Sequence, residues 1–98
     1  MNITKNQNGN ALVIALEGRL DTTTAPELEK VLKESLNGIT ELTIDLSKLD
    51  YVSSAGLRVL LSAHKAMRTQ GAMKVKNVNE IVREVFDVTG FSDILDIE

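Results

Sequence analysis

Along this chain, apolar residues recur in some segments at every second position, which is typical of strands, and in others at every third or fourth position, which is typical of helices. A weak strand pattern over Asn2–Gln7 leads to Asn8-Gly9, a dipeptide typical of hairpin turns because both residues accept a positive φ. The run Ala11–Leu16 is continuously apolar, which predicts a central strand that is buried on both faces. We expect Glu17–Thr23 to be a loop.

A helix is predicted to follow this loop. Thr24 and Glu27 have the spacing of a capping box, and a proline falls in the first turn, where no backbone N–H is needed. Glu29 and Lys33 are spaced to pair on the polar face, and Asn37-Gly38 should end the helix. The apolar stripe consists of Leu28, Val31, Leu32 and Leu36.

Two further strands and a helix are expected to form one βαβ unit. Apolar and polar side chains alternate over residues 42–46 and again over residues 73–76, which predicts strands with one covered face. Between them, an amphipathic pattern predicts a helix from about Ser54 to Gln70. Because such crossovers join parallel strands with a right-handed turn, these two strands should be parallel.

The pattern near the C-terminus predicts a third helix, capped by Asn77 or Asn79. Gly90 in the left-handed conformation would stop it, and Phe91 would then fold back onto Phe86. Its apolar stripe consists of Ile81, Val82, Val85 and Phe86. Together the elements predict a small α/β fold with a mixed, mostly parallel β-sheet and helices packed mainly on one face.

Composition narrows the class of protein. The 98 residues are expected to form one domain, 1–98. A net charge of −3 and only two phenylalanines and one tyrosine argue against nucleic-acid binding. The run Ala11–Leu16 is too short for a membrane span or a signal-peptide core, so we expect no membrane insertion and a cytoplasmic location. With no cysteine and one histidine, neither a metal site nor a cofactor is expected.

The segment Ser53–Gly56 lies between a strand and a helix and carries the most distinctive chemistry. In parallel α/β units such loops gather at the carboxyl end of the sheet, where ligands bind. A helix N-terminus offers unpaired N–H groups and a positive dipole end, which stabilise a phosphate. Gly56 would let another backbone come close. Two interpretations remain open: an ordinary serine cap, or a place where a phosphate is attached or held.

Nucleophilic catalysis by these serines is excluded by the lack of a base. His64 is the only histidine and lies ten residues after Ser54 on the same predicted helix, about 15 Å along its axis. It is expected to be a partly buried structural residue. The glycine-rich phosphate-binding motifs of nucleotide enzymes are also absent. The sequence therefore predicts a protein that is not an enzyme.

Three stretches of the chain carry a family resemblance. The stretch LTIDLSKLDYVSSAGLRVLLSAHKAM resembles the core of STAS domains, specifically of bacterial anti-sigma factor antagonists. VIALEGRLDTTTAPELEKVL is similar to the second strand, Gly-x-Leu-Asp loop and first helix of that family, and FDVTGFSDILDI to its C-terminal segment. The resemblance covers essentially the whole chain and implies the STAS fold.

The resemblance also implies a modification site. In that family, the serine two places before a Gly-Leu pair is phosphorylated by a partner that is both anti-sigma factor and serine kinase. Ser54 occupies this place, and the same hydroxyl could cap the helix before it receives a phosphate. Ser53 stands where many members have aspartate, and Ala55 where many have Ser or Thr. Asp21 matches the loop aspartate of the family, although it could also be an ordinary turn residue.

The function implied is a switch based on protein binding. The unphosphorylated protein would bind the anti-sigma factor and so free a sigma factor, and phosphorylation of Ser54 would end this binding. The partner would bind the ATP, and a separate PP2C-type phosphatase would reset the switch. The partner-binding residues would be Asp21, Thr22, Ser53, Ala55, Gly56 and Arg58, together with the exposed Ser62. The alternatives are a STAS docking subunit of a membrane transporter or lipid-transport ATPase complex and, with less support, direct nucleotide binding.

Overall fold

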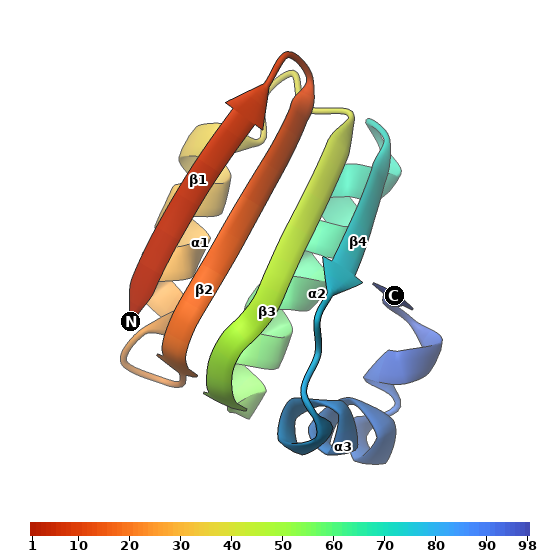
Figure 1. Ribbon diagram of the computed structural model, residues 1–98. Coiled ribbons are helices and arrows are strands. Elements are labelled where there is room, and N and C mark those ends of the chain that lie inside the picture. Colours follow the sequence, from red (N-terminus) through yellow and green to blue (C-terminus); the bar gives the residue numbers. More distant parts are fainter.

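The computed structural model describes residues 1–98, and its central feature is one five-stranded sheet of order β1-β2-β3-β4-β5 (Figure 1). The antiparallel pair is β1 (Asn2–Asn8) with β2 (Ala11–Leu20). The following strands β3 (Glu41–Val52), β4 (Ala72–Lys76) and β5 (Asp96–Ile97) each run parallel to the strand before them. The sheet is therefore mixed and mostly parallel, as predicted.

The helices leave one face of the sheet open. Helices α1 (Ala25–Ser35) and α2 (Ser54–Arg68) lie side by side on the same face, behind the sheet in Figure 1. Helix α3 (Glu80–Thr89) lies beyond the carboxyl end of β4 and is followed by the 3-10 turn η1 (Phe91–Asp93). None of the helices combines the length and the apolar composition that crossing a membrane requires.

The core lies between the sheet and its two covering helices. It consists of 24 buried residues, all of them apolar, so burial of hydrocarbon rather than buried polar pairing holds the layers together. Over residues 42–46 alternate side chains of β3 are buried, and α1 meets them with the expected stripe, in which Leu28 and Leu32 are buried. Glu29 and Lys33 form the predicted ion pair on the polar face at 3.0 Å.

The expectation for β2 is wrong in two respects. The strand continues to Leu20, through part of the segment expected to be a loop, and two shifts in its register with β3 accommodate this extension. One shift lies at Gly18, whose φ of 107° is open to glycine. Residues 11–16 are also not buried on both faces, since Val13 is 39% exposed. The reason is that no helix covers that face.

Two helix ends differ from the sequence expectation. Thr24 makes no capping hydrogen bond to α1, because its hydroxyl is directed back at the preceding loop: it donates to the Arg19 carbonyl at 2.7 Å and accepts from the Asp21 N–H at 2.8 Å. Helix α2 ends at Arg68 rather than at Gln70. The Gln70 side chain instead donates to two backbone carbonyls after α1, and so joins the ends of the two helices.

The capping of α3 agrees with the sequence, whereas one residue of its stripe does not. Asn79 is the N-cap and accepts from the Val82 N–H at 2.9 Å, and Gly90 ends the helix at a φ of 81°. Phe91 packs against the edge of the core. Ile81, predicted to belong to the apolar stripe, is 63% exposed, because α3 buries only Val82 and Phe86.

Candidate functional site at the carboxyl end of the sheet

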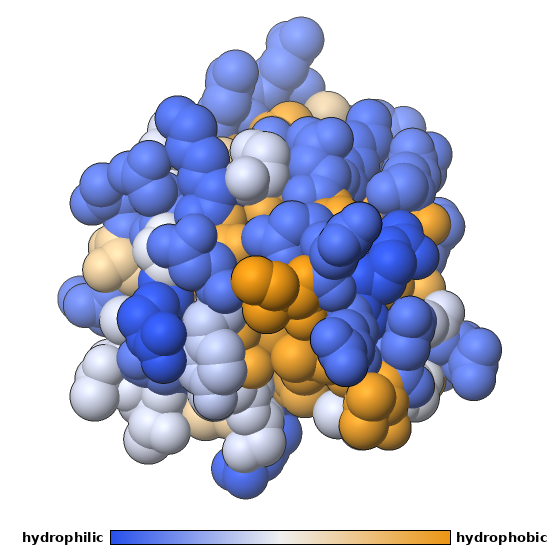
Figure 2. Space-filling view, turned by 60° about the horizontal axis from the view of Figure 1, so that its bottom comes forward, coloured by the Kyte–Doolittle hydropathy of each residue, from blue (hydrophilic) through white to orange (hydrophobic).

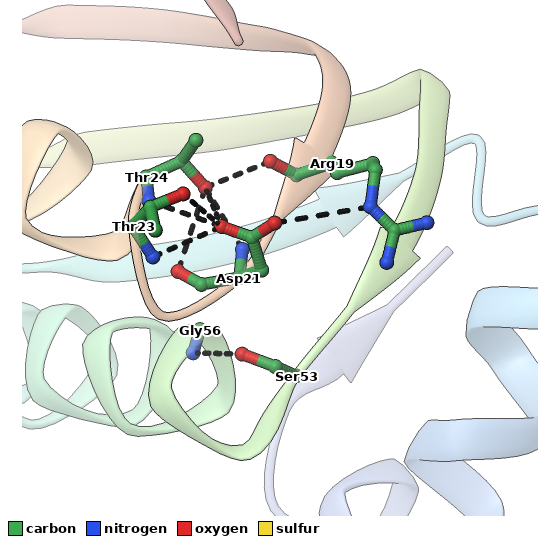
Figure 3. A network of polar contacts seen from close by, with 6 residues as sticks. All are labelled: Arg19, Asp21, Thr23, Thr24, Ser53 and Gly56. Carbon is green, nitrogen blue, oxygen red and sulfur yellow. Dashed lines mark hydrogen bonds and ion pairs between the residues drawn. The ribbon is translucent and has the colours of Figure 1, made fainter.

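The loop after β2 and the start of α2 lie next to each other. Leu20 and Val52 are register partners at the ends of β2 and β3, and the Ser53 N–H donates to the Leu20 carbonyl at 2.8 Å. The chain therefore enters the 21–24 loop and helix α2 from neighbouring points, as Figure 3 shows. Ser53–Gly56 thus lies at the carboxyl end of the sheet, as predicted, and the loop after β2 lies beside it because β2 runs parallel to β3.

Asp21 organises its loop through one carboxylate oxygen. Oδ1 accepts hydrogen bonds from the Thr23 N–H at 3.0 Å, the Thr23 hydroxyl at 2.8 Å and the Thr24 N–H at 3.2 Å (Figure 3). The hydrogen bond from the Thr23 hydroxyl is the largest influence that holds the pKa of Asp21 below its ordinary value, and the two backbone N–H groups act in the same direction. Asp21 is thus an ionised turn residue that fixes the shape of this surface loop.

The two adjacent serines have different structural roles. Ser53 is the N-cap of α2: its backbone is extended, with φ −96° and ψ 174°, and its hydroxyl accepts from the Gly56 N–H at 3.4 Å. Ser54 is the first helical residue, and its exposed hydroxyl has no hydrogen-bond partner. The expectation that the Ser54 hydroxyl could cap the helix is therefore wrong, because the helix starts one residue too early for it.

Gly56 brings α2 into close contact with the ends of the strands. A Cβ atom at this position would lie 2.6 and 2.9 Å from two side-chain carbons of Leu20 and 3.0 Å from Cγ2 of Val52. What approaches this glycine is thus a pair of side chains rather than another backbone. Gly56 is buried, so its contribution to the site is to seat the helix and not to touch a partner.

The other candidate partner-binding residues lie along the junction of α1 and α2. A shallow groove runs between the first halves of the two helices, and its lining includes Thr22, Ala55, Arg58 and Ser62. Three of these are exposed and Ala55 is half-buried. Figure 2 views this end of the molecule, where weakly polar side chains gather on one side and a few apolar ones near the centre. Such a mixed, shallow surface suits protein binding better than small-molecule binding.

Two residues of this end escaped the sequence reasoning. Arg19 and Tyr51 are register partners on β2 and β3, and the Arg19 guanidinium carbon lies 4.3 Å from the centre of the Tyr51 ring. The Nε atom of Arg19 also lies 3.8 Å from Oδ2 of Asp21. The sequence predicts a loop at Arg19, whereas its pairing with Tyr51 depends on the extension and shifted register of β2. The only signal in the sequence is the tyrosine itself, two residues before the serine pair.

The structure also shows where His64 lies and how far apart the acidic side chains are. His64 is half-buried on α2, well away from Ser54 along the helix axis. No three histidine or carboxylate side chains lie close enough together to hold a metal ion.

Comparison with known proteins places the chain in a family. The sequence model of the STAS domain matches residues 2–98. The anti-sigma-B factor antagonist of Bacillus subtilis is 33% identical, in an alignment that covers 99% of this chain and 90% of the relative. The crystal structure of an anti-sigma factor antagonist from Mycobacterium paratuberculosis superposes with a TM-score of 0.89 at 22% identity, covering 98% of this chain and 83% of that one.

A further solved structure, of the Bacillus cell fate determinant SpoIIAA in its phosphorylated form, has a TM-score of 0.77 at 17% identity over 99% of this chain and 91% of that chain. The chain described here belongs to the STAS domain family, and the fold expected from the resemblance is confirmed. Within that family it is an anti-sigma factor antagonist, a non-enzymatic regulator.

Proposed function

We propose that this protein binds an anti-sigma factor that is also a serine kinase, and that phosphorylation of Ser54 ends the binding. The observation that carries the proposal is the free, exposed hydroxyl of Ser54 at the start of α2, beside a separate cap at Ser53. Because the cap does not use the Ser54 oxygen, a kinase can modify it without removing a structural hydrogen bond. The 33% identity to the Bacillus subtilis antagonist supports the same function.

The binding surface in this proposal combines the loop after β2 with the first turns of α2. Its contact residues are Asp21, Thr22, Ser53, Ala55 and Arg58, and the buried Gly56 holds the helix in place for them. Binding of the unphosphorylated protein releases the sigma factor. These events take place in the cytoplasm, ATP is bound by the partner, and a PP2C-type phosphatase resets the protein, which acts as one STAS domain over residues 1–98.

Phosphorylation acts in this proposal through charge and not through refolding. A phosphate adds about −1.5 to −2 charges to the middle of the contact surface. The N-terminus of α2 offers unpaired N–H groups and the positive end of the helix dipole, so the phosphorylated protein keeps its fold. The partner is then repelled from the surface, and a loss of about 1.4 kcal/mol in binding is already tenfold in affinity.

The decisive experiment compares serine variants with the anti-sigma factor of the same organism. Ser54→Ala should incorporate no phosphate and keep its affinity, since the unmodified form is the binding form. Ser54→Asp should bind at least about tenfold more weakly. Ser53→Ala is the matched control and should still be phosphorylated. Binding is measured by titration calorimetry, and the modified serine is located by mass spectrometry.

The opposite results would have distinct meanings. Phosphate retained on Ser54→Ala and lost on Ser53→Ala would move the site by one residue. Equal affinity of the parent and Ser54→Asp would contradict the switch and favour a docking subunit of a transporter complex without a phosphorylation cycle. Binding of ATP or GTP by the isolated protein in the same calorimeter would instead favour direct nucleotide binding.

A further inference from the structure

We propose that Arg19 receives an acidic side chain of the anti-sigma factor and is a specificity-determining residue of the interface. This inference rests on the proposed function and adds a contact on the open side of the sheet, next to the serine pair. Arg19 is exposed over 62% of its side chain and lies at the carboxyl end of β2, at the same end of the sheet as Ser53.

The guanidinium of Arg19 is held in one place without its donors being used. The guanidinium carbon lies over the Tyr51 ring, 4.3 Å from its centre, and the Asp21 carboxylate lies 3.8 Å from Nε. The second distance is longer than a hydrogen bond, so the carboxylate orients the group but leaves the N–H free. The side chain of Arg19 donates no hydrogen bond within the chain. Its five N–H groups therefore remain available for a carboxylate, which an arginine binds through two parallel hydrogen bonds.

The supporting residues are fixed by the sheet. Arg19 and Tyr51 are register partners on two neighbouring strands, and the residues that follow them, Leu20 and Val52, are buried in the core. Asp21 is locked by its hydrogen bonds to the 23–24 segment. A side chain that is held in its binding geometry before the partner arrives loses little entropy on binding, which is a property of residues that dominate interface energies.

Charge favours an acidic occupant over a basic or apolar one. The outer surface of this cluster is a cation on an aromatic platform, and arginine with tyrosine is a composition enriched at binding hot spots. A carboxylate at Arg19 would also face the same end of the sheet as the proposed phosphate on Ser54. The two negative groups would repel each other, so an acidic contact here makes binding more sensitive to phosphorylation.

The test is a titration of the anti-sigma factor with variants of this cluster. Arg19→Ala should weaken the Kd at least about tenfold, as hot-spot residues do. Arg19→Lys should also weaken it, because a lysine keeps the charge but loses the planar fork. Tyr51→Phe keeps the ring and should stay within about twofold of the parent, whereas Tyr51→Ala should lose affinity. Lys74→Ala is the matched control, because it removes another exposed cation that is paired with one carboxylate, Glu98, at 3.5 Å.

The dependence of affinity on salt separates an ion pair with the partner from a merely structural role. The affinity of the parent should fall as salt is raised, and that of Arg19→Ala should fall less, whereas a structural defect would leave the salt dependence unchanged.

Circular dichroism checks that each variant is folded. Arg19→Ala with a Kd within about twofold of the parent, or no weaker than Lys74→Ala, would overturn the inference while leaving the proposed function standing. If Arg19→Ala changes only the rate of phosphate incorporation, the guanidinium serves the phosphate and the inference is also overturned. Failure of the parent itself to bind would overturn both proposals.

Discussion

The hydroxyl oxygen of Ser53 lies 3.4 Å from the amide nitrogen of Gly56 and caps helix α2, while the hydroxyl of the next residue, Ser54, has no partner. The two neighbouring serines thus have different roles: Ser53 caps the first turn of the helix, and Ser54 is exposed to the solvent. The capping role of Ser53 and the proposed phosphorylation of Ser54 can therefore be tested one at a time.

Ser53→Ala should therefore destabilise the protein, and Ser54→Ala should not. Loss of an N-cap hydroxyl typically costs about 1 kcal/mol, and an exposed residue in the first turn changes stability by less than about 0.5 kcal/mol. Urea denaturation of the parent and both variants measures the difference. A larger loss for Ser54→Ala than for Ser53→Ala would show that the cap assignment is wrong.

Gly56→Ala should destabilise the protein by about 1–3 kcal/mol, which is the usual cost of an extra carbon in a packed core. The new Cβ would lie 2.6 Å from the branched carbon of Leu20, a side chain that is itself fully buried and has little room to move. Ser62→Ala is the control on the exposed face of the same helix and should change stability by less than about 0.5 kcal/mol. Thermal unfolding of both variants measures the cost. An unchanged midpoint for Gly56→Ala would contradict the close packing at this site.

Asp21 should make stability depend on pH at the acid end. Hydrogen bonds, that from the Thr23 hydroxyl first, hold the pKa of Asp21 below its ordinary value in the folded protein. Its contribution to stability is therefore fully present above the unfolded pKa of about 3.9 and is lost as the pH falls through the folded pKa. Asp21→Asn should be less stable than the parent at pH 7, and the difference in unfolding midpoint should shrink below about pH 4. A difference that stays constant with pH would assign the effect to shape and not to charge.

Gly90→Val should destabilise α3 by more than about 1 kcal/mol, because Gly90 ends the helix at a φ of 81° that a β-branched residue avoids. No heavy atom beyond the two neighbouring residues lies within 4 Å of a Cβ at this position, so the cost is conformational and not steric crowding. Gly90→Asn is the matched variant and should lose less, since asparagine tolerates this conformation. Equal midpoints for all three proteins in chemical denaturation would contradict the helix end described here.

Local signals predicted most of the fold. The alternation over residues 42–46 and in β4, an asparagine cap before α3 and the glycine stop after it all depend on residues close in sequence. The structure confirms them, although β3 continues to Val52. The wrong predictions concern residues whose burial depends on segments that are distant in the sequence. The continuously apolar start of β2 indicated a strand buried on both faces, but the open face of the sheet leaves Val13 exposed. Ile81 fits a helical stripe equally well, yet the place of α3 at the end of the sheet turns it to the solvent.

At the candidate site, too, the roles of single residues depend on contacts that the local sequence does not contain. Ser53 and Ser54 are equally good caps in the sequence, and the choice between them depends on where the chain leaves β3. The hydroxyl of Thr24 was expected to cap α1, but the Arg19 carbonyl and the Asp21 N–H lie within its reach and use it instead. The Arg19–Tyr51 pair requires a register between two strands, which no pattern in one segment contains.

Leu20 connects the two halves of the candidate site, because its carbonyl accepts from the Ser53 N–H while its buried side chain lies against Gly56. We therefore expect the loop after β2 and the first turn of α2 to keep their positions relative to each other. A partner that contacts both segments meets a surface already assembled before the encounter, so association should be fast and little affected by solvent viscosity beyond the diffusion step. Relaxation-dispersion measurements on the amides of Asp21 and Ser54 would then find no slow exchange between separate arrangements of the two segments.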